Sequence, residues 1–387
     1  MEIGKEDPYY LSEEEKKSRI EEVSQKIFGK PSRDIRYTMV TNYIHQQLLD
    51  EGLTRTGCYQ WINVFRGEVK YPRDVLDFND YDIVQVNMSA QDIHLVQNIR
   101  EQLGSDSKTK IVLNNDYTTE VWGLSFDYPN IISREINGAD MLFGTEYFQS
   151  TALAELSGRN VSVIPHPADV KRLKSLTPVP KKELLTTIWR RYDAFVYIPH
   201  LVTRNHGITT QLIGYDKKLD KKVWLTTTLY DYVYAGTNYL DFCNQLQESK
   251  VMYDPFTFHS YSRTTVDTAA LKTAVVGSSR TQSVPLLYPY TTLDPYDVRG
   301  GRILINKLLT DKSFYDKVID TAYERVEFYN HLNSKYRYMV ALEKSLEEKD
   351  SNVNQVVYKK ELVKGRGDDI LQVKARELNR NGNKKTN

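Results

Sequence analysis

Apolar residues in the first half of the chain recur in short runs, separated by polar turns and by longer amphipathic segments. Short apolar runs bounded by turn residues predict buried strands, whereas apolar positions three and four apart predict helices. The pattern predicts strands at residues 37–40, 59–65, 81–86, 110–113, 139–143 and 161–164. It predicts helices at residues 44–53, 90–103 and 146–156, each followed or closed by a glycine. Because strands alternate with helices, we expect a parallel, doubly wound α/β sheet whose ligands bind beyond the carboxyl ends of its strands.

A second alternating series follows a linker at residues 175–182 that contains Pro178 and Pro180. The pattern predicts strands at residues 194–198, 210–215, 251–253 and 274–276, and an apolar run at 224–229 fits either a strand or a loop. It predicts helices at residues 183–191, 239–246 and 265–271, and one long helix or a pair at 313–347. A length of 387 residues also favours two domains of ordinary size.

Both ends of the chain differ from these two series. A charged amphipathic helix opens near Ser12 and stops at Gly29, so residues 1–33 are expected to be a helical appendage. The polar segment at residues 350–387 is expected to be a disordered tail that is basic near its end. The predicted organisation is therefore an appendage (1–33), a first domain (34–175), a second domain (183–330), a further helix (331–349) and a tail (350–387).

Composition narrows the class of protein. Charged residues make up 27% of the chain and nearly balance, with a formal net charge of +1, which gives no general attraction to nucleic acid or to a membrane. The 28 tyrosines suit polyol contact, although composition alone also explains their number. With only Cys58 and Cys243, no disulfide framework can form, and a reducing cytoplasm is expected. The acidic, polar N-terminal residues are unlike a signal peptide, and no apolar run is long enough for a transmembrane helix.

Common motifs of cofactor and metal sites do not occur. The chain has no G-x-G-x-x-G, no Walker phosphate loop and no H-E-x-x-H, so dinucleotide oxidoreductases, kinases of that type and zincins lose support. The triplet Asp80-Tyr81-Asp82 precedes an apolar run, so we interpret its carboxylates as loop and capping groups. The seven histidines form no metal-binding spacing with cysteines or carboxylates, and no metal site is predicted.

The stretch at residues 251–279, VMYDPFTFHSYSRTTVDTAALKTAVVGSS, carries the most specific signal. It predicts a strand, a polar and aromatic loop, a helix capped by Thr264 or Thr265, and a second strand. Asp267 is expected in the first turn of the helix, where the helix dipole favours a carboxylate. A loop that ends at a helix N-terminus offers free N–H groups, which suit an anion or a set of hydroxyls.

This stretch resembles the nucleotide-sugar site of retaining glycosyltransferases of the GT-B fold, the group that includes glycogen and sucrose synthases. That family has two glutamates with seven residues between them, and His259 and Asp267 stand at this spacing here. The segment from Asp267 to Ser278 follows the second half of the motif, whereas Ser260 and Ser262 occupy positions of loop glycines. The resemblance implies that His259 and the segment Ser260-Tyr261-Ser262 hold the donor sugar, and that Asp267 binds the nucleotide ribose.

The resemblance extends to both predicted domains. Residues 199–207 resemble the family's diphosphate loop, which implies that Arg204, with His200 or His206, neutralises the diphosphate. Residues 139–169 resemble the end of a GT-B N-terminal domain. The loop after residue 113 is similar to one that often carries His-Asp facing the acceptor. Here the pair is Asn115-Asp116, which the resemblance places on the acceptor side, with Asp116 and His259 as catalytic candidates.

The resemblance implies two Rossmann-like domains facing a cleft, with a C-terminal helix that crosses back to the first domain. It implies a cytoplasmic hexosyltransferase, metal-independent and retaining, that needs no cofactor beyond its nucleotide-sugar co-substrate. The acceptor hydroxyl is open between glycan, lipid and modified nucleotide, and the basic tail allows peripheral membrane contact. Two alternatives share this fold: a nucleotide-sugar 2-epimerase, and a catalytically degenerate domain that serves as a binding protein. Replacement of the first glutamate by His259 favours the degenerate domain.

Overall fold

The computed structural model describes residues 11–41, 57–88, 95–104, 106–116, 135–136, 138–188, 194–203, 206–213, 230–234 and 238–351. The predicted helix at 44–53 and the apolar run at 224–229 therefore lie outside the described residues. Residues Met1–Glu348 form one compact unit, and the expected tail belongs to a second unit, Lys349–Asn387. Among the described residues, no helix combines the length and the hydrophobicity that a membrane span requires.

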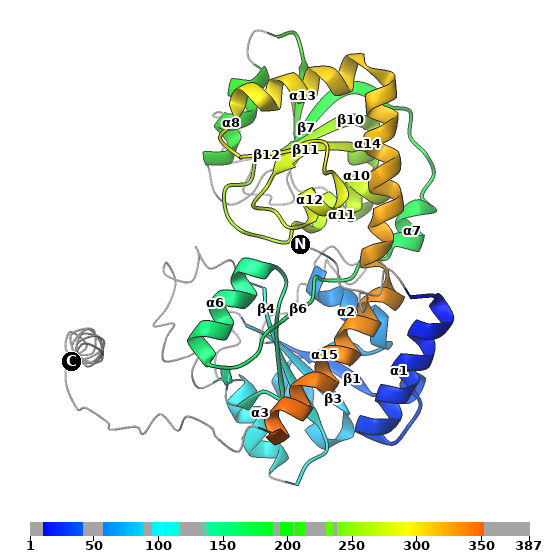
Figure 1. Ribbon diagram of the computed structural model, residues 1–387, viewed down its shortest axis with the longest axis vertical. Coiled ribbons are helices and arrows are strands. Elements are labelled where there is room, and N and C mark those ends of the chain that lie inside the picture. Colours follow the sequence, from blue (N-terminus) through cyan, green and yellow to red (C-terminus); the bar gives the residue numbers. More distant parts are fainter. Residues whose placement is uncertain are drawn as a thin grey trace, which may run out of the picture. The chain divides into compact units, whose positions relative to one another are not determined.

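The first sheet (sheet A) has six parallel strands in the order β2-β1-β3-β4-β5-β6. Figure 1 labels β1, β3, β4 and β6 of this sheet. Its strands are β1 (Tyr37–Val40), β2 (Glu68–Lys70), β3 (Ile83–Met88), β4 (Lys110–Asn115), β5 (Met141–Gly144) and β6 (Ser162–Val163). The helices of this series among the described residues include α2 (Gln60–Phe65), α3 (Leu95–Leu103) and α6 (Tyr147–Ser157). The register pairs Leu113 with Val86 and with Leu142, so the carboxyl ends of β3, β4 and β5 lie at one edge.

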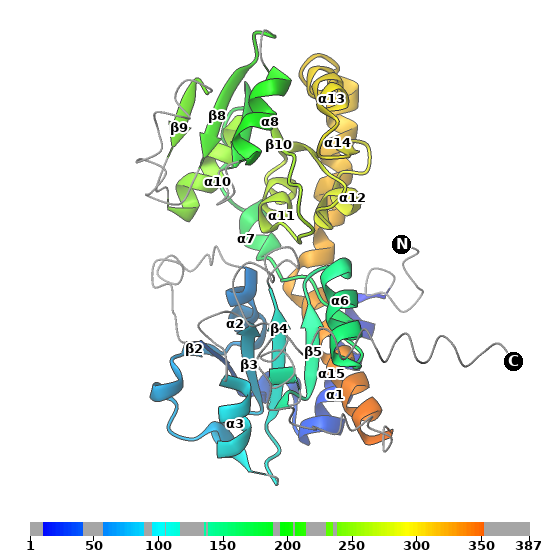
Figure 2. The same ribbon diagram turned by 90° about the vertical axis from the view of Figure 1, so that its left-hand side faces the viewer.

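The second sheet (sheet B) also has six parallel strands, in the order β12-β11-β10-β7-β8-β9. Figure 2 labels β8, β9 and β10 of this sheet. Its strands are β7 (Lys182–Ile188), β8 (Thr209–Ile213), β9 (Tyr232–Tyr234), β10 (Ser249–Asp254), β11 (Ala274–Ser278) and β12 (Thr292–Leu293). Its helices are α8 (Ala194–Thr203), α10 (Tyr239–Glu248), α11 (Arg263–Ala270), α12 (Ser283–Leu287), α13 (Val298–Thr310) and α14 (Lys312–Arg325). Helix α8 packs against α13, and α10 packs against α11. The strand order reverses direction after β9, so right-handed crossovers place these two helix pairs on opposite faces.

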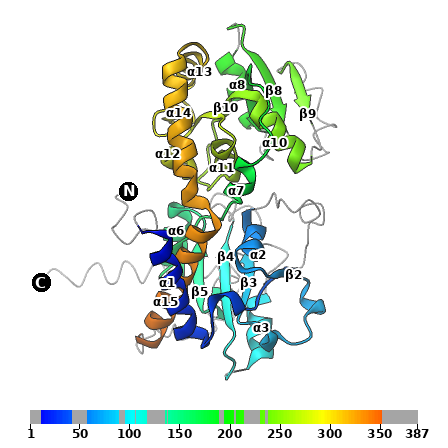
Figure 3. The ribbon, with the colours of Figure 1, turned by 90° about the vertical axis from the view of Figure 1, so that its right-hand side faces the viewer.

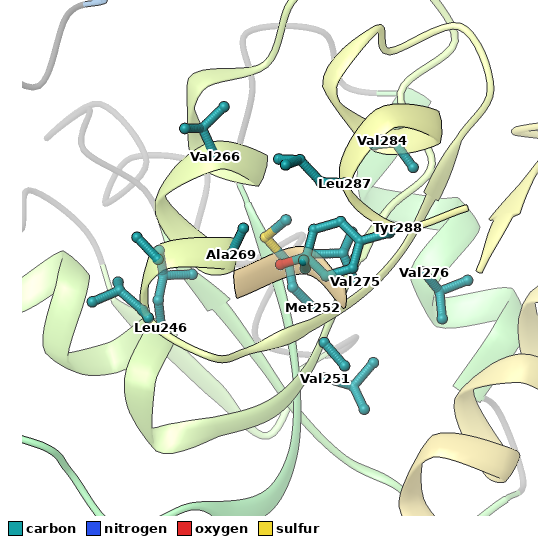
Figure 4. Close-up of a cluster of buried hydrophobic side chains, with 14 of the residues drawn as sticks. Leu246, Val251, Met252, Val266, Ala269, Val275, Val276, Val284, Leu287 and Tyr288 are labelled. Atoms are coloured by element: carbon teal, nitrogen blue, oxygen red, sulfur yellow. The ribbon is translucent and has the colours of Figure 1, made fainter. Parts of the chain in front are cut away.

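Strands β10 and β11 lie at the centre of the sheet B core. Val251, Met252, Val275 and Val276 are completely buried, which explains why both strands read as continuous apolar runs. Figure 4 shows these side chains with Leu246, Val266, Ala269, Val284, Leu287 and Tyr288 from the neighbouring helical segments. Each such aliphatic side chain contributes about 1.5–3 kcal/mol through burial. The core therefore fixes the positions at which β10 and β11 end and their loops begin.

Two helices from opposite ends of the chain pack together on sheet A. Helix α1 (Glu13–Phe28) starts with a capping box at Ser12, and α15 (His331–Ser351) lies beside it (Figure 3). Glu343 of α15 accepts hydrogen bonds from Arg19 at 2.5 Å and Lys26 at 2.9 Å. Tyr336, Tyr338, Met339 and Leu342 of α15 join the apolar cluster of Trp61, Phe65 and Phe143 in the first sheet's layer. The expected helix that returns from the second series to the first domain is confirmed.

Three sequence predictions of secondary structure are wrong. Residues 183–191 were expected to be a helix, but Lys182–Ile188 is strand β7, and residues 194–198 were expected to be a strand, but lie in helix α8. Residues 59–65, also expected to be a strand, contain helix α2. Its buried Trp61, Val64 and Phe65 stand three and four positions apart, which suits a helix that covers a sheet with one face.

Candidate functional site

The carboxyl edge of sheet A carries the residues that were predicted on the acceptor side. Asn115 is the last residue of β4 and is fully buried, whereas Asp116 follows the strand and keeps 37% of its side chain exposed. Beside it, His166 follows β6 and is only 2% exposed. His166 Nε2 lies 2.9 Å from Asp116 Oδ1. A histidine therefore does stand next to this aspartate, but it comes from another strand.

The hydrogen bonds of His166 determine which ring nitrogen carries the proton. Trp61 Nε1–H can only donate, and it donates to His166 Nδ1 at 3.2 Å. Nδ1 must then be the acceptor, so the neutral ring carries its proton on Nε2 and donates it to Asp116 Oδ1. The backbone of Gly57 packs closely against His166, because a Cβ at position 57 would lie 2.8 Å from the His166 Cβ. The imidazole is therefore held in one orientation and one tautomer.

The turn at residues 165–167 is held by the loop that follows β10. Tyr261 O–H donates to the His166 carbonyl at 2.8 Å, and its ring meets the His166 ring edge to face at 5.8 Å. Arg263 Nη1 donates to the Pro167 carbonyl at 3.1 Å. The loop that was predicted to bind the nucleotide sugar thus contacts the turn that positions Asp116.

Two neighbouring hydroxyls lie where β10 and β11 end. Ser260 and Thr281 form an isolated parallel bridge, and Gln282 N donates to the Ser260 carbonyl at 2.8 Å. The Oγ of Ser260 and the Oγ1 of Thr281 are buried, and no hydrogen bond to either oxygen is formed within the described part of the chain. Since buried hydroxyls are normally paired, this pair marks a place where a ligand could supply partners.

Ser262 occupies the N-cap of α11 with φ 55°, a backbone conformation that favours glycine. Its Oγ donates to Asp254 Oδ2 at 3.2 Å and accepts from Thr265 Oγ1 at 3.0 Å. The predicted caps, Thr264 and Thr265, therefore lie inside the helix, which begins at Arg263. The positive φ fits the glycine that the resembled motif has at this position.

Asp267 lies one turn into α11 and not in its first turn, and its side chain is only 2% exposed. Arg263 Nε donates to Asp267 Oδ1 at 2.7 Å. Burial raises the pKa of Asp267, and the Arg263 guanidinium opposes that shift. Burial disfavours the charged form of Arg263, but attraction to the Asp267 carboxylate is stronger than this effect of burial. The pKa of Arg263 is therefore above its usual range. The pair is an internal ion pair of the helix.

His259 and the predicted diphosphate residues lie in different places. His259 stacks on Phe148 of α6, with ring centroids 4.3 Å apart. Tyr147 N, also in α6, donates to Gln282 Oε1 at 3.0 Å. His200 is in the last turn of α8, and His206 precedes β8, which starts at Thr209. Because β7 and β8 are parallel, the residues before β8 lie at the amino edge of sheet B, away from Asp254.

The structure thus brings His259, Ser260, Tyr261, Ser262 and Asp267 together around the start of α11. It does not bring His200 or His206 to them, and Arg204 lies outside the described residues. Sequence reasoning missed His166, Trp61 and Thr281. The order of the strands was the signal that could have found His166, since β4 and β6 end at the same edge, on either side of β5. Among the described residues, no group of three His, Cys, Asp or Glu side chains could hold a metal ion.

Two parallel six-stranded sheets with flanking helices, and a C-terminal helix that returns to the first sheet, define the GT-B fold. The chain is similar to a trehalose-6-phosphate protein of E. coli bound with UDP-2-fluoro glucose (TM-score 0.61, 11% identity, 80% of this chain and 99% of that chain). It is similar to HepE of Anabaena in complex with UDP (TM-score 0.56, 12% identity, 82% and 100%). An alpha-glucosyltransferase in complex with UDP and DNA containing an HMU base has a TM-score of 0.54 at 13% identity, over 76% and 95%. No family model and no curated protein sequence matches the chain.

Proposed function

We propose that the protein is a glycosyltransferase that moves a hexose from a nucleotide-sugar donor to a hydroxyl acceptor. The proposal rests on the buried hydroxyls of Ser260 and Thr281 beside the N-terminus of α11, to which no described residue forms a hydrogen bond. Sugar hydroxyls supply the donors and acceptors that such oxygens lack. Three similar structures of this fold contain UDP or a UDP-sugar, which supports a nucleotide sugar as the donor.

The proposed reaction retains the configuration at the anomeric carbon and needs no metal. The acceptor oxygen bonds to the anomeric carbon while the bond from that carbon to the diphosphate oxygen breaks. The electron pair leaves with the diphosphate, which takes the proton of the acceptor hydroxyl. Free N–H groups at the start of α11 are suited to stabilise charge on the donor side. Asp116, at the carboxyl edge of sheet A, is the acceptor-side group.

The test is a thermal-shift and mass-spectrometry screen of the full chain against UDP-, GDP-, ADP- and TDP-sugars, with and without magnesium. Stabilisation by a nucleotide sugar, with its slow hydrolysis in the absence of magnesium, is the expected result. No stabilisation by any of these donors would refute the proposal. A new nucleotide sugar formed without acceptor would identify an epimerase instead.

A matched variant makes the screen specific to the two hydroxyls. Thr281→Val keeps the shape of the side chain and removes an unsatisfied oxygen, so the free protein should be at least as stable as wild type. The stabilisation by the nucleotide sugar should shrink, because the ligand loses a partner. Lys312→Met replaces an exposed side chain of α14 and is the control. It should leave unchanged both the stability of the free protein and the stabilisation by the nucleotide sugar.

A binding protein without turnover is the second candidate, and two contacts favour it. Arg263 occupies the carboxylate of Asp267, and Phe148 covers one face of the His259 ring. Asp267 and His259 correspond to the positions that contact the donor in the resembled motif. Binding of a nucleotide sugar without hydrolysis, even with a mixture of hydroxyl acceptors, would establish this candidate.

A further inference from the structure

We propose that His166 is a positioning residue that orients the Asp116 carboxylate toward the hydroxyl of the acceptor. The inference rests on the proposed function and adds to it a residue that the predicted site did not include. Its basis is the chain of contacts from Trp61 through His166 to Asp116 at the carboxyl edge of sheet A.

The buried imidazole is connected on both sides. Trp61 is completely buried, and its Nε1–H occupies the lone pair of His166 Nδ1. A proton on Nδ1 would place two N–H groups against each other, so Nε2–H is the donor toward Asp116. A charge-assisted hydrogen bond of 2.9 Å to Oδ1 then limits rotation of the carboxylate.

Asp116 remains accessible to a ligand. Its side chain is 37% exposed, whereas His166 is 2% exposed. With Oδ1 engaged by His166, Oδ2 can accept a hydrogen bond from an incoming hydroxyl. Because the His166 side chain is buried, we expect the acceptor to contact Asp116 and not His166, so the effect of His166 on the reaction passes through Asp116.

The loop after β10, which was predicted to hold the donor sugar, and the start of α11 contact the backbone around His166. Tyr261 donates to the His166 carbonyl, and Arg263 donates to the Pro167 carbonyl. Tyr261 belongs to the segment that was predicted to hold the donor sugar. A movement of this loop would therefore move the turn that carries His166, which links donor binding to the orientation of the acceptor carboxylate.

The experiment compares wild type with His166→Gln, His166→Phe, Asp116→Asn and the double variant His166→Phe/Asp116→Asn. Each full-length protein receives UDP-glucose, UDP-N-acetylglucosamine, GDP-mannose, ADP-glucose or TDP-glucose, with glucose as the acceptor. Release of nucleoside diphosphate gives kcat and the donor KM. Gln keeps an N–H near the place of Nε2, whereas Phe keeps a ring without it.

His166→Phe should lower kcat on the order of 10²-fold with little change in donor KM, the effect expected of a misplaced reacting group. His166→Gln should recover much of this loss, and the double variant should be no slower than Asp116→Asn alone. Losses that multiply in the double variant, or a raised donor KM at unchanged kcat, would overturn the inference. A wild type that releases no nucleoside diphosphate from any donor would overturn the proposed function, and the inference with it.

Since a buried variant can fail to fold, a measurement on the wild type stands beside the kinetics. Long-range 1H–15N spectra of protein labelled at histidine report which ring nitrogen carries the proton, and His166→Gln assigns the signal. The Nε2–H tautomer is expected at pH 7.5. The Nδ1–H tautomer would overturn the inference, whatever the kinetic result.

Discussion

Replacing Arg263 by Met should destabilise the protein far more than removing an exposed ion pair of the same spacing. Arg263 and Asp267 stand four positions apart on α11, and their side chains are only 10% and 2% exposed. Met fills a similar volume but leaves the Asp267 carboxylate buried without its cation. Breaking a buried pair in this way costs about 3–5 kcal/mol. The carbonyl of Pro167 also loses the Nη1–H donor that it has in the wild type.

Urea denaturation of the full chain measures this loss. With an m value of about 3 kcal/mol/M, the midpoint should fall by at least about 1 M. The matched control is Lys312→Met on α14, which breaks an ion pair with Asp316, also four positions apart. Its side chains are 86% and 44% exposed, so it should change stability by no more than about 0.5 kcal/mol.

A third variant separates charge from packing. Arg263→Met with Asp267→Leu removes both charges, so it should recover most of the stability that the single variant loses. Equal midpoints for Arg263→Met and Lys312→Met would refute the argument from burial. A double variant that is less stable than Arg263→Met would show that the Tyr239 hydroxyl, which also hydrogen-bonds to Asp267, stabilises the carboxylate without Arg263.

Three further predictions concern other parts of the molecule. Burial lowers the pKa of His331, so the neutral side chain contributes stability above about pH 6.5, and this stability is lost as the pH falls below that value. The free energy of unfolding should therefore drop more between pH 7.5 and 5.5 in wild type than in His331→Asn, and equal drops would contradict this. Gly57→Ala places a Cβ 2.8 Å from His166, so we expect about 1–3 kcal/mol of destabilisation and a reduced kcat, and an unchanged melting temperature and rate would count against the contact. Glu343→Gln removes the charge that binds two cations of α1, and calorimetry should show a Tm lower by about 2–4 °C at low salt, an effect that high salt should reduce.

The sequence predicts the architecture well where a pattern is local. Val275 and Val276 belong to an apolar run between polar turns, and such a run has one stable solution in a doubly wound sheet, a buried strand. At residues 182–203 the local pattern predicts the wrong secondary structure. The charged start of this stretch suggested a helix and its Phe-Val-Tyr-Ile run a strand, but tertiary pairing with β8 and β10 decides the opposite assignment.

The candidate site was less predictable because its contacts join residues far apart in sequence. The spacing of His259 and Asp267 located the loop and the start of α11, and the resemblance placed Asp116 on the acceptor side. The partner of Asp116 could not be read from spacing, since His166 is 50 residues away and reaches it only through the strand order. The same is true of Arg263, whose role depends on a carbonyl 96 residues earlier.

The position of α15 has a consequence for synthesis of the protein. Its Tyr338 lies against Trp61, Phe65 and Phe143, with ring centroids 4.9, 5.0 and 5.8 Å apart. These aromatic rings of the first sheet's layer are therefore covered by a helix that leaves the ribosome only after the described strands of both sheets. While the chain grows, the first half has an incomplete core and an exposed aromatic surface that a chaperone could bind. A truncation before residue 331 should accordingly aggregate, although every strand of both sheets is present.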